Sequence, residues 1–178
     1  MKWLMMIAAV LMVGGVAGAA EIPAQSTIRL QLLNAAKVPD DVLEKSRQQV
    51  ARIFEQAGVE VVWTAEAPRL TVIIIPRVLG FDRATSPVMG AALKTTSGLL
   101  VQVFFQQVEG FARSHHVDLS TILGHVIAHE VGHLMLPTES HSPTGLMRAE
   151  WDSAQMRDVV RGAVTFTDEQ AESIRARH

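Results

Sequence analysis

The residues of this 178-residue sequence that could do chemistry lie in one stretch, residues 129–147, which reads HEVGHLMLPTESHSPTGLM. His129 and His133 are four positions apart, so on a helix their imidazoles share one face. Two neutral imidazoles at this spacing suit zinc, which prefers nitrogen ligands in a tetrahedral arrangement. Glu130 is turned too far round the helix to be an easy third ligand, but it would lie near a zinc-activated water, where a general base is needed. The pattern predicts a ligand pair with a base, and histidines that merely pack are the plainer alternative.

Two residues could supply the third metal ligand after Pro137 ends the helix. His141 completes a three-histidine set, and it follows His133 by eight residues, enough chain to reach back to the metal. Glu139 would instead give two histidines and a glutamate, which is also a known zinc set. We predict His141 as the ligand, because a glutamate in such a loop is usually solvated, and keep Glu139 as the alternative.

Three further histidines, Met147 and Trp151 are predicted to have structural or indirect roles rather than to bind the metal. His125 is predicted to be a buried packing histidine, with an indirect role beside the metal as the alternative. His115 and His116 are expected in an exposed loop ahead of the motif helix. Met147 should form an apolar floor beneath the metal, and Trp151 should either wall the substrate pocket or join the core.

The motif resembles that of the metzincin clan of zinc endopeptidases, which is HExxHxxGxxH followed by a turn that contains methionine. The stretch GHLMLPTESHSPTGLM is similar to the matrixin type, and Met147 follows His129 by 18 residues, as in matrixins. Leu136 and Glu139 stand where the clan has its glycine and its third histidine, so His141 lies two positions beyond the clan pattern. The chain has no tyrosine, which excludes the phenolic zinc ligand of astacin-like relatives.

The function predicted from these residues and this resemblance is that of an exported zinc-dependent endopeptidase. Zn²⁺ would be held by His129, His133 and His141, and Glu130 would take a proton from the activated water and return it to the leaving amine. The substrate would be a peptide or a protein. A zinc-dependent amidase or other non-peptide hydrolase, and a catalytically inactive exported binding module of the same fold, remain the alternatives.

The elements that must position these residues follow from the spacing of apolar side chains. Strands are predicted over 27–34, 59–63, 70–76 and 99–105, with residues 88–93 forming a hairpin with the last. Helices are predicted from an Asp40 cap to Gly58, over the motif from an Asp118 or Ser120 cap to Leu136, and twice near the C-terminus, where Thr167 and Gln170 form a capping box. This order predicts the α+β class, with a small mixed sheet, a long N-terminal helix, an active-site helix and closing helices, as in metzincins.

Residues 1–20, MKWLMMIAAVLMVGGVAGAA, have the lysine, the apolar run and the small residues of a secretory signal peptide. Cleavage is expected after Ala19 or Ala20, and an uncleaved anchor helix is the alternative. Residues 21–178 would then be a single catalytic domain in the periplasm or outside the cell. No second long apolar run follows, so no stable membrane insertion is expected after cleavage.

The composition narrows the class of partner. The 16 basic and 18 acidic residues are nearly balanced and aromatic residues make up 5%, which argues against a nucleic-acid partner. The chain has no cysteine, so its fold cannot depend on disulfides. The domain must therefore be stabilised by its apolar core.

Overall fold

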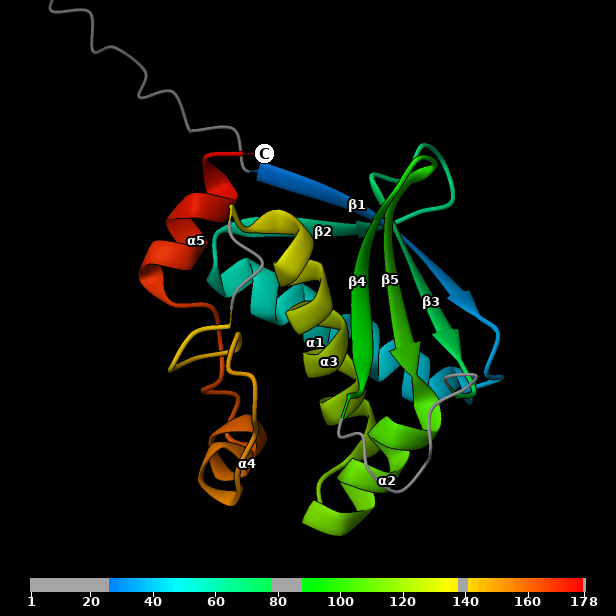
Figure 1. The fold of residues 1–178 in the computed structure, drawn as a ribbon, viewed down its shortest axis with the longest axis vertical. Coiled ribbons are helices and arrows are strands. Elements are labelled where there is room, and N and C mark those ends of the chain that lie inside the picture. The colour runs from blue at the N-terminus through cyan, green and yellow to red at the C-terminus, as the bar shows by residue number, and fades with distance from the viewer. Residues whose placement is uncertain (1–25, 78–87, 138–140, 178) are drawn as a thin grey trace, which may run out of the picture.

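The computed structural model describes residues 26–77, 88–137 and 141–177 (Figure 1). Its strands are β1 (Ser26–Asn34), β2 (Val59–Trp63), β3 (Leu70–Ile75), β4 (Gly90–Thr95) and β5 (Gly98–Phe104). Its helices are α1 (Asp40–Gln56), α2 (Phe105–His115), α3 (Leu119–Met135), α4 (Ser153–Val160) and α5 (Asp168–Arg175). The predicted signal peptide with both cleavage sites, and Glu139, lie outside the described residues. Within them, no helix has the length and apolar character needed to cross a membrane.

The strands form one mixed sheet in the order β2-β1-β3-β5-β4. β1 pairs in parallel with β2 and with β3, β3 pairs in parallel with β5, and β4 is antiparallel to β5. The first half of β1 pairs with β2 as far as Trp63, and its second half pairs with β3 from Leu70 on, so both registers meet at Leu30. β2 ends and β3 begins at the level of Leu30, on opposite edges of β1, so the short segment 64–69 is enough to join them.

The parallel pairs place the fold in the α/β class rather than the α+β class that the sequence predicted. The reason is the crossover through α1, because a helix that returns the chain between two neighbouring strands makes those strands parallel. The mixed sheet, the long first helix, the motif helix and the two closing helices are confirmed. The predicted hairpin is also confirmed as the antiparallel pair β4–β5.

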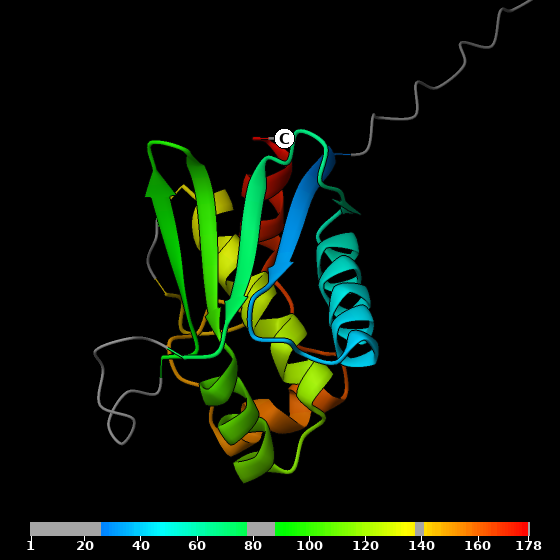
Figure 2. The same ribbon diagram turned by 90° about the vertical axis from the view of Figure 1, so that its right-hand side faces the viewer.

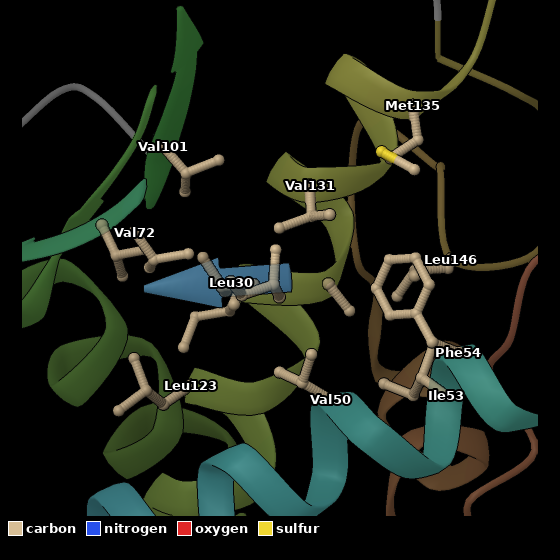
Figure 3. Close-up of a cluster of buried hydrophobic side chains, with 14 of the residues drawn as sticks. Leu30, Val50, Ile53, Phe54, Val72, Val101, Leu123, Val131, Met135 and Leu146 are labelled. Carbon is tan, nitrogen blue, oxygen red and sulfur yellow. The ribbon is translucent and has the colours of Figure 1, made fainter. Parts of the chain in front are cut away.

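The core lies between the sheet and helices α1 and α3, which cover the same face of it (Figures 1 and 2). Burial alternates along β3, as expected for a strand with one face against helices. Buried side chains reach the core from the sheet, from both helices and from the loop after α3 (Figure 3): Leu30, Val72, Val101, Val50, Ile53, Phe54, Leu123, Val131, Met135 and Leu146. Leu146 is fully buried, so apolar burial, at roughly 1.5–3 kcal/mol for such a side chain, holds the loop that follows the motif.

Helix α2 was missed by the sequence prediction, which placed His115 and His116 in an exposed loop. His115 is instead the last residue of α2, half-buried, with its ring stacked on Phe111 at 4.1 Å between centroids. His116 is exposed, as predicted, and ends the helix in a left-handed conformation. No side-chain cap marks the start of α2, and Gly110 in its middle has a low helical propensity, so the segment lacks the usual sequence signals of a helix.

Helix caps elsewhere were predicted with mixed success. Asp118 accepts a hydrogen bond from the Thr121 amide, as expected of the cap of α3. The capping box that Thr167 and Gln170 form at the start of α5 is confirmed. The predicted Asp40 cap is wrong, because Pro39 occupies the cap position and Asp40 is the first helical residue, where its charge favours the helix dipole.

Candidate metal centre

Helix α3 provides a rigid base for the motif. Nearly all of its residues are buried, between the sheet, α1 and the C-terminal segment, so it presents no solvent-facing stripe along most of its length. It ends at Met135, and Leu136 is extended, as expected for the residue before Pro137. Side chains on α3 are therefore fixed by packing on several sides.

The three predicted ligands meet in space. His129, His133 and His141 each offer a ring nitrogen, and these nitrogens lie within 4.8 Å of one another. Ring centroids are 4.7 Å apart for His129 and His133, 5.4 Å for His129 and His141, and 4.9 Å for His133 and His141. His129 is buried, His133 is partly buried and His141 is exposed, so the group is anchored in the protein on one side and reaches solvent on the other.

The distances suit a metal ion. The Nε2 atoms of His129 and His133 are 3.0 Å apart. Two nitrogen ligands bound to one tetrahedral zinc at about 2.05 Å would be roughly 3.3 Å apart, so a shift of a few tenths of an ångström would complete the pair. Imidazole nitrogens bind zinc, copper, iron and nickel, and the three histidines alone do not choose among these metals.

A backbone carbonyl fixes the orientation of His129. Its Nδ1 lies 2.8 Å from the Leu146 carbonyl oxygen, which can only accept, so Nδ1 donates and Nε2 carries the lone pair. The pKa of His129 is lowered from 6.5 to about 4, mainly by burial; the Leu146 bond opposes this shift, and the neighbouring His133 and His141 add to it. At neutral pH the imidazole is therefore uncharged, with its lone pair available to a metal.

The loop that carries His141 is held by the C-terminal segment. The Ser142 amide donates to the Met147 carbonyl at 2.8 Å, which closes the turn. The Leu146 amide donates to the Thr165 carbonyl at 2.8 Å, which ties the turn to the chain before α5. Gln170 adds a side-chain bond to the Ser142 hydroxyl at 3.2 Å. The position of the third histidine thus depends on residues far along the chain.

Met147 packs against the motif helix at Gly132, and its predicted role as an apolar floor beneath the metal stays a prediction. It is fully buried, and its sulfur would be only 2.6 Å from a β-carbon added at Gly132 of α3. The same added atom would lie 2.8 Å from the Phe166 ring. Gly132 therefore provides the clearance that lets the turn pack directly against α3.

Glu130 is the buried acid of the site. It is 8% exposed, and burial raises its pKa from 4.5 to about 7. It lines the same cleft as the three histidines, yet it is not among the grouped ligand atoms. A carboxyl group whose pKa lies near neutrality can both accept and release a proton at pH 7, which is the property a general base requires.

With metal removed by a chelator, Glu130→Gln should raise the free energy of unfolding above pH 7. Between pH 4.5 and about 7 the folded wild type keeps the Glu130 proton, whereas the unfolded chain has released it, so wild-type stability falls as the pH rises. This rise in pKa, from 4.5 to about 7, corresponds to roughly 3 kcal/mol as an upper bound. Glutamine does not ionise and avoids this loss.

Urea denaturation of both proteins at about pH 5 and about pH 8 tests this prediction. His129 acts in the opposite direction, because its lowered pKa costs stability as the pH falls from 6.5 to about 4. That contribution is common to both proteins, so the difference between them isolates Glu130. The difference should be small at the lower pH and large at the higher one. An equal difference in unfolding free energy at the two pH values would contradict the raised pKa of Glu130 in the folded protein.

The histidines open into a cleft of about 590 Å³ between α3, β4 and the segment after the turn. Trp151 lines this cleft and is half-buried, packed against the core, so it combines features of both predicted alternatives, and its contact with substrate stays a prediction. Its ring lies 6.0 Å from His129 and 6.4 Å from Phe111, edge-on in each case. The apolar side of the cleft also includes Val126, one turn before Glu130.

His125 is a buried packing histidine, as predicted. It is fully buried and its Nδ1 donates to the Thr121 carbonyl of its own helix at 2.8 Å. Its ring lies edge-on to Trp151, at 6.1 Å between centroids, and it is not among the grouped ligands. Burial lowers its pKa, so it is neutral near pH 7.

Sequence reasoning missed several contributors to the site. Among them are the Leu146 carbonyl, the cleft wall formed by Phe111 of α2, and Gly90 at the start of β4, which packs against Glu130. The first and third of these have no side chain in the contact, so no residue type marks them. A glycine inside a predicted strand was the available signal for Gly90.

The comparisons with known proteins assign no family. The sequence matches no protein-family model and has no significant match among curated proteins.

Proposed function

We propose that this protein is a zinc-dependent endopeptidase. The observation that carries the proposal is that the buried Glu130 carboxyl and the three histidines line one cleft, whose opposite wall is the edge strand β4. Three histidines with an adjoining glutamate that is not a ligand are the parts of a hydrolytic zinc site. The resemblance to the metzincin motif supports the same proposal.

His129, His133 and His141 would hold a zinc ion, which would polarise the scissile carbonyl as a Lewis acid and lower the pKa of a water to about 7. Glu130 takes a proton from that water and later gives it to the leaving amine. The hydrogen bond from His129 to the Leu146 carbonyl keeps the imidazole lone pair turned toward the cleft. The apolar wall around Trp151 excludes water from one side of the reacting groups.

The position of β4 favours a peptide over a small-molecule substrate. It is the outermost strand of the sheet, and Gly90, Ala91 and Ala92 line the cleft. An extended peptide can add to such an edge as a further strand, held by main-chain hydrogen bonds. The small side chains of this strand would let the peptide approach closely.

The proposal is tested by measuring metal content and peptide cleavage on the same preparation. The purified protein should contain about one zinc per chain, consistent with the three-histidine group found among the described residues. It should cleave unstructured peptides, lose that activity with a chelator and regain it with zinc. Cleavage of amides but not of peptides would favour the non-peptide hydrolase. Zinc content without any turnover would favour a binding module.

A further inference from the structure

We propose that Gly90 is a positioning residue that keeps the Glu130 carboxylate in its place in the cleft. A β-carbon built on Gly90 would lie 2.6 Å from Glu130 Cγ, 2.9 Å from Cδ and 2.8 Å from Oε1. Real β-carbons essentially never come this close to another heavy atom, so any side chain at position 90 would displace Glu130 or the strand. The inference rests on the proposed function, in which Glu130 is the base.

The backbone conformation does not explain the glycine. Gly90 is not among the described glycines with a positive φ, so an L-residue could adopt its conformation. A glycine inside a strand weakens the strand and marks a place where another group approaches closely. Here the approaching group is Glu130. The glycine is therefore explained by the space that the Glu130 side chain needs.

The strand cannot easily give way to a larger residue. Gly90 is paired with Val103 of β5, and the adjoining Met89 carbonyl accepts a hydrogen bond from the Phe104 amide at 2.9 Å. Gly90 is itself buried, in the strand that packs against α3. The least costly response to alanine is therefore a rotation of the Glu130 side chain, which moves the carboxylate.

Gly90 differs from the other closely packed glycines of the described segments. A β-carbon at Gly124 would meet Gln49, and one at Gly132 would meet Met147 and Phe166, which are packing contacts. Only at Gly90, among the glycines described, are the closest atoms those of an ionisable cleft residue. The clearance at Gly90 thus belongs to the site rather than to the general packing of α3.

A thermal double-mutant cycle tests this coupling without requiring turnover. Gly90→Ala should lower the midpoint of unfolding by roughly 3–10 °C in the wild-type background. In the Glu130→Ala background it should lower the midpoint little, because Cγ, Cδ and Oε1 are then absent. Gly110→Ala is the matched control, since Gly110 is an exposed helical glycine with nothing within 4 Å of the added carbon. It should leave the midpoint unchanged or slightly raised in both backgrounds.

Equal losses in the two backgrounds would overturn the proposal, because the strand and not Glu130 would then be the obstacle. If Gly90→Ala alone does not fold, recovery of folding in the double variant with Glu130→Ala supports the proposal, and failure of both variants overturns it. These outcomes do not depend on whether the protein is a peptidase, so failure of the proposed function is recognised separately.

A kinetic measurement separates positioning of the base from a general effect on the strand. Gly90→Ala should lower kcat for peptide cleavage by about 10- to 100-fold, because a base displaced by about 1 Å loses that much rate. Zinc affinity should stay within a few-fold of wild type, and so should KM. A change in KM with an unchanged kcat would show that Gly90 contributes to substrate binding instead, and would contradict the positioning role.

Discussion

Glu130→Gln should lower kcat for peptide cleavage by about 10²- to 10⁴-fold. Glutamine has nearly the same shape as glutamate, so it should fit the space beside Gly90, but its amide cannot take up the proton of the attacking water. Glu130 does not belong to the group of three histidines that could hold the metal, so the affinity for zinc should be retained. Rates on a fluorogenic peptide and zinc titrations on the same samples provide the comparison.

Glu55→Gln is the matched control for this substitution. Glu55 is an exposed glutamate of α1, and its replacement removes one negative charge without touching the cleft. Its activity should equal that of the wild type. A near-normal cleavage rate in Glu130→Gln would mean that another group takes the proton, and the mechanism proposed above would be wrong.

His141→Ala should weaken zinc binding by more than about 100-fold. Substitutions that only disturb the partners of a ligand already cost about 10- to 100-fold in affinity, and loss of the ligand itself should cost more. The chain around it should remain folded, because the turn is closed by the bond from Ser142 to Met147 and tied to Thr165 through Leu146. Metal-free His141→Ala should therefore unfold at the wild-type temperature, while zinc should stabilise it much less than the wild type.

Two further variants make the result decisive. Glu139→Ala tests the alternative ligand and should change zinc affinity little. His116→Asn controls for the loss of an exposed histidine, and asparagine tolerates the left-handed conformation found at that position. Titration of all three against a competing chelator at one pH ranks them. If Glu139→Ala loses the metal and His141→Ala keeps it, the metal is held by two histidines and a glutamate.

Local sequence signals predicted the elements that depend on local interactions. The motif helix was found because Asp118 caps it and Pro137 prevents its continuation. The capping box of Thr167 and Gln170 marked α5 in the same way. The four-residue spacing of His129 and His133 was enough to place both rings on one face of the motif helix. In each case the partners lie within a few residues along the chain, so their types and spacing were sufficient.

Helix α2 shows where local signals were insufficient. The chain passes from β5 into α2 with no break and no side-chain cap, and Gly110 lowers the helical propensity of the segment. Its contacts with α3 compensate, since Val108 and Ala112 are buried in the common core. The parallel arrangement of most strands was missed for a related reason, because it is fixed by pairings between distant segments.

The sequence by itself determined which residues could bind a metal and which could act as a base, since imidazole and carboxylate chemistry belongs to the residue types. Only the tertiary structure decided the relative positions, the orientation and the burial of these residues. It brought His141 to the other two histidines, turned His129 through the Leu146 carbonyl, and buried Glu130 against Gly90. The physical reason is that ligand geometry, tautomer and pKa depend on backbone groups and on exclusion of water by distant segments. Neither of these is encoded in the spacing of a motif.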